Sequence, residues 1–122
     1  MRPPLLVLAL IPVIALAQAS FPTTFPPDAV PIAPETVKQR LSGKVFFIKP
    51  ATGAEIRVQY QDTHAFTSAG GFSDSGRWRV EGSSVCVEWQ KIPPSCSELR
   101  MLGDVLYTKR GSNGEVVAMQ ER

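Results

Sequence analysis

Apolar and polar residues alternate with a period of two over much of the chain from Lys44 onward. In the stretch 55–60, Ile56, Val58 and Tyr60 alternate with polar residues. Such alternation is typical of a strand that buries one face and exposes the other. The pattern returns in short stretches between turn residues, and it predicts seven or eight short strands, most of them joined by tight turns.

The clearest alternation lies on either side of Gly82-Ser83, within the stretch 76–96. A two-residue turn with glycine first suits type II′ geometry, so we expect a hairpin centred there. The expected cross-strand pairs are Trp78–Val87 and Val80–Val85 on an apolar face, and Arg77–Glu88 and Arg79–Cys86 on a polar face. Pattern and turn agree, because one register yields both an apolar face and an opposite-charge pair.

Other elements follow from weaker patterns. Residues 45–48 are apolar on both faces, which indicates either a doubly buried strand or an outer face covered by a helix. Residues 64–68 predict a weaker strand, and residues 69–75 predict a flexible loop. Near the C-terminus, Asn113-Gly114 is a strong hairpin signal. The pairs expected across that turn are Thr108–Met119 and Arg110–Val117.

One short helix is predicted over residues 34–43. Pro34 suits the first turn, and Gly43 can end the helix. Val37 and Leu41 lie four residues apart and form a small apolar face. We expect this helix to cover one end of the sheet.

The predicted fold class is all-β: a small antiparallel meander or barrel of seven to eight short strands with one short N-terminal helix. A meander of this kind tends to curl into a barrel, because closure removes its exposed edges. The sequence leaves open whether the sheet closes. A barrel this small is expected to fill with its own side chains, so we predict no large ligand cavity.

The N-terminal residues have the order of a secretory signal peptide. A basic start at Arg2 precedes an apolar run over residues 5–16, and small-x-small sites follow that end at Ala17 or Ala19. The run is too short for a membrane span, although an N-terminal anchor is the alternative. We predict a signal peptide over residues 1–19, a periplasmic or secreted location, and no stable membrane insertion after cleavage.

Residues 20–34 are rich in proline, at positions 22, 26, 27, 31 and 34. This spacing blocks helix and sheet and favours an extended, polyproline-like segment. We expect a disordered linker that leads into a β-domain over residues 35–122. The alternative is a recognition arm, because the segment contains apolar residues that a linker does not need, namely Phe21, Phe25, Val30 and Ile32.

Cys86 and Cys96 are the two cysteines of the chain. In an exported protein, the oxidising compartment favours a disulfide between them. Both fall on the polar face of their predicted strands, so we expect the bond on the outer surface of the sheet as a structural staple. The absence of a Cys-x-x-Cys motif argues against redox catalysis.

The charge of the chain does not indicate a charged partner. It carries 13 basic and 11 acidic residues, spread along its length. This balance lacks the basic patch that nucleic acids or anionic membranes attract. We therefore predict no nucleic-acid partner.

The residue types of common catalytic sites are sparse. His64 is the single histidine, and we expect it to be a half-exposed strand residue. The stretch 71–76 resembles a serine-nucleophile elbow, but Ser75 stands where the motif requires glycine. No cluster has metal-ligand spacing either. We predict no catalytic residue, no metal, no cofactor and no enzymatic activity.

Tryptophan is the residue type most often recruited for binding, and the chain has two. The predicted register turns Trp78 into the core, whereas Trp89 ends its strand beside a proline-containing loop. The possible binding surface therefore lies at that end of the hairpin and consists of Trp89, Ile92, Pro93, Pro94 and Phe72.

Glycine, tryptophan and cysteine recur in the pattern Gly-x-Trp … Cys-x-x-Trp … Cys, after a Leu-x-Gly-Lys motif. The matching residues are Leu41, Gly43, Lys44, Gly76, Trp78, Cys86, Trp89, Cys96, Gly103 and Asp104. From Thr36 onward the chain resembles a family of small exported proteobacterial, mainly alphaproteobacterial, β-domains of unknown function. Members often carry an Asp-Gly turn before the tryptophan strand, where this chain has Gly70-Gly71. The resemblance implies a periplasmic or secreted β-domain and no activity.

A looser, fold-level likeness exists to periplasmic inhibitors of lysozyme and of metalloproteases. These are also small, exported, disulfide-stapled β-barrels, although no inhibitory motif is matched here. We therefore expect an exported non-enzymatic binding or structural module with a protein or small-molecule partner in the envelope. The alternative is an inhibitor of an envelope or host hydrolase, a lysozyme or a protease, acting through residues 20–34 or through the edge from Trp89 to Pro94.

Overall fold

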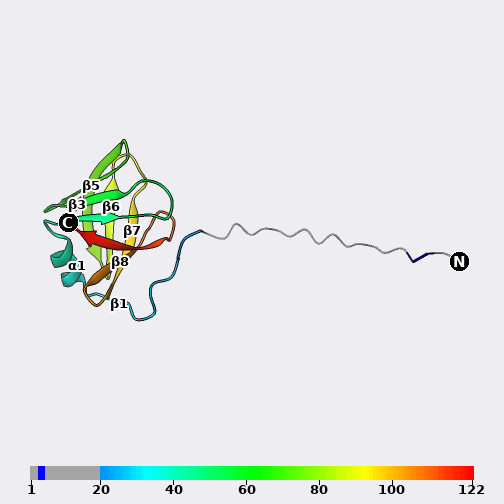
Figure 1. Cartoon of the computed structure of the whole chain (residues 1–122). Helices are drawn as coiled ribbons and strands as arrows, with labels where there is room; N and C mark the ends of the chain where they lie inside the picture. The colour runs from blue at the N-terminus through cyan, green and yellow to red at the C-terminus, as the bar shows by residue number, and fades with distance from the viewer. Residues whose placement is uncertain (1–2, 5–19) are drawn as a thin grey trace.

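A computed structural model describes residues 3–4 and 20–122 of the chain (Figure 1). Apart from Pro3 and Pro4, the predicted signal peptide lies outside the described residues. The described part contains one helix and nine strands. Their bounds are β1 Val30–Pro31, α1 Pro34–Leu41, β2 Val45–Ile48, β3 Ile56–Tyr60, β4 His64–Ala69, β5 Phe72–Glu81, β6 Ser84–Trp89, β7 Ser95–Leu102, β8 Val105–Lys109 and β9 Val116–Glu121.

Strands β2 to β9 form a closed, eight-stranded antiparallel barrel (Figure 1). Each strand pairs with the next one along the chain, and β9 pairs with β2 to close the sheet. The predicted all-β fold with one short helix is confirmed, and the sheet closes. The short β1 is an addition to the barrel: it pairs with β7 at Arg100 and Met101, beyond the last β6–β7 pair at Glu98.

The large core side chains gather at the end of the barrel beside α1. Val37 and Leu41 of the helix are fully buried, as their spacing predicts. In the same cluster, the Tyr60 ring makes edge-to-face contacts with Phe46 and Trp78, at centroid separations of 6.2 and 5.2 Å. Trp78 is a core residue, as predicted. Its indole N–H donates to the Gln61 carbonyl at 2.6 Å, which satisfies the polar atom inside the core.

The hairpin of β5 and β6 forms in the predicted register. All four predicted pairs are confirmed: Arg77–Glu88, Trp78–Val87, Arg79–Cys86 and Val80–Val85. Gly82 has a φ of +57°, whereas Ser83 has no positive φ. A positive φ at the first turn residue alone is what type II′ geometry requires, and glycine adopts it without steric cost.

The hairpin of β8 and β9 forms two residues away from the predicted register. The predicted pairs Thr108–Met119 and Arg110–Val117 are wrong, and the observed pairs are Leu106–Met119, Tyr107–Ala118, Thr108–Val117 and Lys109–Val116. The turn is wider than Asn113-Gly114, because the Arg110 N–H donates to the Glu115 carbonyl at 2.8 Å and encloses residues 111–114. A two-residue shift leaves each side chain on its predicted face.

The stretch 69–75, predicted to be a flexible loop, is mostly strand. β4 ends at Ala69, β5 begins at Phe72, and these two residues pair across the Gly70-Gly71 turn. Ser73, Asp74 and Ser75 of this strand are small or polar. Apolar and polar residues therefore do not alternate here. Alternation indicates a strand only where apolar residues occupy its buried face.

The apolar outer face of β2 is covered by an arginine and not by the helix. Phe46 and Ile48 are buried on the inner face. Phe47 is half-buried on the outer face, with the Arg122 guanidinium 4.3 Å from its ring centroid, a cation–π distance. The helix α1 lies instead beside β5 and β6.

Residues 20–34 do not form a free linker, and the prediction that their prolines block sheet is wrong at β1, which pairs with β7. The range also contains a turn at residues 27–28, and its last residue, Pro34, begins α1. Ala29 and Ile32 are buried. The Pro22 carbonyl accepts a hydrogen bond from the Val116 N–H at 2.8 Å, and β1 pairs with β7. Ile32 is buried and Phe21 and Phe25 are half-buried, so these apolar residues dock the segment, the N-terminal arm, on the outside of the barrel, whereas Val30 stays exposed.

Cys86 and Cys96 form a disulfide between paired positions of β6 and β7. The predicted pairing is confirmed. Cys86 shares the outward face with Arg79, its partner on β5, yet it is only 1% exposed. The bond therefore reaches the surface at Cys96 and is buried at Cys86.

Replacing both cysteines, Cys86→Ala with Cys96→Ala, should lower the free energy of unfolding by about 2.5–3 kcal/mol, because the bond closes a short loop in the unfolded chain. Urea unfolding of the purified protein measures the effect. The wild type under reducing conditions should unfold at the same urea concentration as the variant. Equal midpoints for oxidised wild type and variant would contradict the stabilising role.

Gly76→Ala should disrupt the β5–β6 pairing. A Cβ at position 76 would overlap the Glu88 carbonyl oxygen, a backbone atom that cannot move without separating the strands. We expect a loss of about 3 kcal/mol in the free energy of unfolding. Gly71→Ala is the matched control, since a Cβ there meets no atom within 4 Å and φ is not positive. Equal stability of the two variants would refute the steric argument.

Candidate functional site

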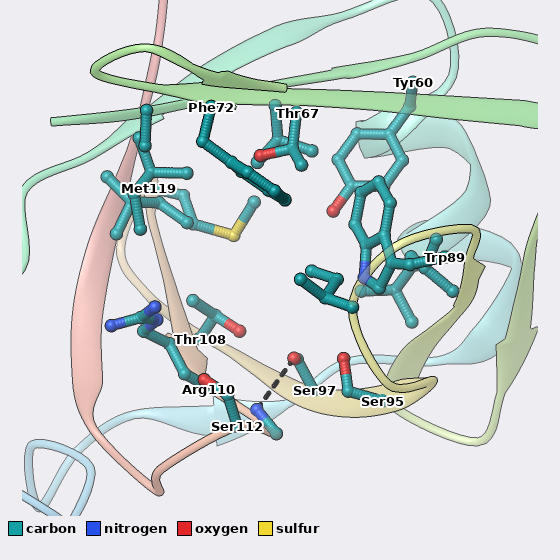
Figure 2. Close-up of a pocket in the computed structure, with 18 residues that line it drawn as sticks. Tyr60, Thr67, Phe72, Trp89, Ser95, Ser97, Thr108, Arg110, Ser112 and Met119 are labelled. Carbon is teal, nitrogen blue, oxygen red and sulfur yellow. Dashed lines mark hydrogen bonds between the residues drawn. The ribbon is translucent and has the colours of Figure 1, made fainter. Parts of the chain in front are cut away.

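The barrel contains a cavity at the end away from α1 (Figure 2). Its volume is about 280 Å³. The lining includes Ile48, Ala69 and Trp89, which are the last residues of β2, β4 and β6. The prediction that the barrel would fill with its own side chains is therefore wrong at this end.

The cavity exists because inward side chains change in size along the barrel. Phe46 and Trp78 fill the space near α1. At the other end the lining includes the small residues Ala69, Ser95 and Ser97. An eight-stranded barrel is just wide enough for its side chains to fill it or for one small ligand to fit. Small inward residues at one end therefore leave an open volume.

Most of the lining is apolar. The aliphatic walls consist of Ile48, Ile56, Val58, Val85, Val87 and Met119. Apolar walls with a few convergent polar groups are the usual composition of small-molecule sites. The volume of about 280 Å³ lies just below the usual range for such sites, so it suits a molecule smaller than a typical drug.

The mouth of the cavity is formed by Phe72, Trp89 and Ile92. Phe72 is 43% exposed and Ile92 is 37% exposed, whereas Trp89 is half-buried. Three of the five residues of the predicted binding surface thus come together around one opening. Pro93 and Pro94 are exposed and lie outside the lining.

The one charged side chain among the described lining residues is Arg110, and its charge is paired. Its guanidinium lies 2.9 Å from a carboxylate oxygen of Glu115, which is almost fully buried. The other oxygen of Glu115 accepts the Ala51 N–H at 2.8 Å. A buried carboxylate needs such partners, because an unpaired one is costly to remove from water. Arg110 therefore offers little free charge to a ligand.

Three hydroxyl groups bring polarity into the apolar part of the cavity, and that of Thr67 already donates to the Arg57 carbonyl at 3.1 Å. Tyr60 and Thr108 are both buried and both line the space. Burial raises the pKa of Tyr60 far above its usual value, so its hydroxyl keeps its proton at neutral pH. By contrast, Ser97 already accepts a hydrogen bond from the Gly111 N–H at 3.0 Å.

Asp74 holds the loop beside the mouth, a role that the sequence analysis did not predict. Its carboxylate is buried and accepts backbone N–H groups of Ser75, Lys91 and Ile92 at 2.8, 2.9 and 3.0 Å. Burial alone would raise the pKa of this carboxyl, but the hydrogen bonds from Lys91, Ile92 and Ser75 bring it below its usual value. The sequence feature that could have placed Asp74 is its even spacing from Phe72 and Trp78. Residues at even spacing lie on the same face of a strand.

The remaining candidates for chemistry lie outside the cavity lining. His64 is exposed on β4, and its Nδ1 lies 2.9 Å from the Thr63 hydroxyl. Glu81, Cys86 and Cys96 lie within 4.8 Å of one another, the spacing of metal ligands. The two sulfurs are joined in the disulfide and carry no thiolate to bind a metal.

Comparison of the chain with protein-family models, with curated proteins and with solved structures finds no match. The resemblance to exported proteobacterial β-domains therefore stays a prediction from the sequence pattern. The function has to be argued from the geometry of the cavity.

Asp74→Asn should destabilise the protein near neutral pH, because the amide cannot supply the charged acceptor that the three N–H groups share. The pKa of Asp74 is lower in the folded protein than in the unfolded chain. The ionised carboxylate therefore stabilises the fold fully above pH values of about 3.9, the ordinary pKa of aspartate. This stabilisation is lost as the pH falls through the pKa of Asp74 in the folded protein. The difference in melting temperature between variant and wild type should therefore shrink in acid. Thermal unfolding between pH 2 and 7 measures it.

Asp62→Asn serves as the control for the loss of one negative charge, because Asp62 is exposed and lies in the turn between β3 and β4. It should change the melting temperature less than Asp74→Asn at neutral pH. A pH-independent difference between Asp74→Asn and wild type would show that the carboxylate charge does not contribute.

Proposed function

We propose that this protein is an exported, non-enzymatic binding module that holds a small, largely apolar molecule inside its barrel. The cavity behind Phe72, Trp89 and Ile92 carries this proposal. It is enclosed by aliphatic side chains, it opens to solvent at one end, and it contains few polar groups. Removing an apolar molecule from water into such a space is favourable in proportion to the area buried.

The location proposed for this activity is the periplasm or the exterior of the cell. The supporting observations are the signal-peptide pattern over residues 1–19 and the Cys86–Cys96 disulfide, which an oxidising compartment favours. Among the residues that the structure describes, no helix has the length and apolar character to cross a membrane. The proposed membership in an exported proteobacterial family agrees with this location.

The non-enzymatic character of the proposal rests on the cavity lining. Its described side chains are aliphatic and aromatic groups, hydroxyls and the paired Arg110. General acid–base catalysis at neutral pH needs a group whose pKa lies near the working pH. The raised pKa of Tyr60 keeps its hydroxyl protonated at neutral pH, so it does not supply a base, and His64 does not line the cavity.

Binding can be measured with N-phenyl-1-naphthylamine, an apolar probe whose fluorescence rises when it leaves water. The wild type should enhance its fluorescence. Ala69→Leu, which extends a side chain into the cavity, should weaken binding by about tenfold. Ala118→Leu is the matched control, because Ala118 precedes the buried Met119 on β9 and faces outward. Equal affinities for wild type and Ala69→Leu would place any bound probe outside the barrel and refute the proposal.

A second candidate is the inhibition of an envelope or host hydrolase, a lysozyme or a protease. The observation that favours it is the exposure of Phe72, Ile92, Pro93 and Pro94 on one rim, since exposed apolar residues mark interaction sites. The N-terminal arm is a weaker means of inhibition, because part of it is already buried against the barrel.

The two candidates separate at Pro93, which is exposed but does not line the cavity. If the rim docks on an enzyme, Pro93→Asp should abolish inhibition of a lysozyme or of a metalloprotease and leave probe binding unchanged. A wild-type protein that inhibits neither enzyme at equimolar concentration would remove this candidate.

A further inference from the structure

Tyr60 presents a hydroxyl group to the cavity from a nearly fully buried position. The residue is 5% exposed, and Figure 2 shows its oxygen directed into the space between Thr67, Phe72 and Trp89. No hydrogen-bond partner for this hydroxyl occurs among residues 3–4 and 20–122. The oxygen is not sealed off either, because Arg40 Nε is the buried side-chain polar atom without a partner in the described residues. The hydroxyl is therefore accessible from the cavity and free to bond a molecule there.

The ring of Tyr60 is held in a fixed orientation. Phe46 and Trp78 contact it edge to face, and its backbone carbonyl accepts the Gly43 N–H at 2.9 Å. A phenylalanine would make the same ring contacts without bringing a polar atom into an apolar space. The hydroxyl therefore adds nothing to the packing, and its direction into the cavity indicates a role towards a bound molecule.

A second hydroxyl enters the same space from β8. Thr108 is 3% exposed and lines the cavity, and Figure 2 shows its oxygen on the side of the open volume. It too has no hydrogen-bond partner in the described part of the chain. Tyr60 and Thr108 come from β3 and β8, so they approach the cavity from different strands of the barrel.

The cavity has no free charge to match a charged ligand. Arg110 is paired with Glu115 at 2.9 Å, and the other described lining residues are uncharged. An ionised group placed among the aliphatic walls would lose its hydration without gaining a counter-charge. The polar groups that remain are neutral hydroxyls, and they favour a neutral partner.

We propose that the bound molecule is neutral and carries a hydrogen-bond acceptor, such as a carbonyl oxygen, that accepts a hydrogen bond from the Tyr60 hydroxyl. This inference rests on the proposed binding function and adds the class of ligand. The aliphatic walls contact the hydrocarbon part of the molecule, and Thr108 offers a second hydrogen-bonding position. Tyr60 is the residue that distinguishes a ketone, ester or aldehyde from a hydrocarbon of the same shape.

The test uses two probes of the same shape, acetophenone and α-methylstyrene, which differ by a carbonyl in place of a vinylidene group. Their dissociation constants are measured by protein-observed NMR titration of wild type and of Tyr60→Phe. The ratio of the acetophenone constant to the α-methylstyrene constant should rise about fivefold in the variant, as expected for one lost hydrogen bond. The α-methylstyrene constant alone should stay the same.

Tyr107→Phe is the matched control, because Tyr107 is the other tyrosine of the chain and does not line the cavity. It should leave both constants unchanged, and Thr108→Val tests the second hydroxyl in the same way. Binding of both probes with an unchanged ratio in Tyr60→Phe would overturn the assignment of the acceptor while leaving the binding function in place. Failure of both probes to bind the wild type would refute the binding function and this inference with it.

Discussion

Closure of the sheet between β2 and β9 is the constraint on which the rest of the structure depends. Once eight strands form a ring, their number fixes the width of the interior. The variable that remains is the size of the inward side chains. Phe46 and Trp78 occupy the space beside α1, and Ala69 and Ser97 leave space at the other end. The cavity thus needs no inserted loop or extra domain, because it follows from the distribution of side-chain volume along the barrel.

Two buried carboxylates hold the loops around the cavity. Asp74 accepts N–H groups from the segment after β6, and Glu115 joins the β8–β9 loop to the start of the β2–β3 loop at Ala51. Loops are usually the most mobile parts of a fold. Charge-assisted hydrogen bonds from carboxylates to backbone groups are stronger than neutral ones, so these loops are held in place. A preformed opening reduces the ordering that a ligand must impose when it binds.

Most strands of the barrel, the short helix, the disulfide and the register of the β5–β6 hairpin could be predicted from the sequence, whereas β1 could not. Alternation reports which face is buried, and Gly82 restricts the turn to few geometries. The alternation pattern failed where a polar residue faces inward, because Asp74 hid the start of β5. The predicted β8–β9 register failed for another reason, since the loop is wider than Asn113-Gly114. Trp89, Ile92 and Phe72, three residues of the predicted surface, line one cavity, but that cavity depends on the sizes of residues from many strands. The pattern within any one strand does not indicate how much space the inward side chains of all strands leave together.

The short strand β1 also bears on the behaviour of the protein in concentrated solution. It pairs with the part of β7 that extends past β6, so it covers the backbone groups that barrel closure leaves unpaired there. An uncovered edge invites a strand from another molecule and leads to aggregation. The covering strand contains Pro31, which lacks an N–H group and cannot continue a regular ladder. The N-terminal arm therefore acts as a terminator of sheet growth and favours dispersed molecules over fibrous assembly.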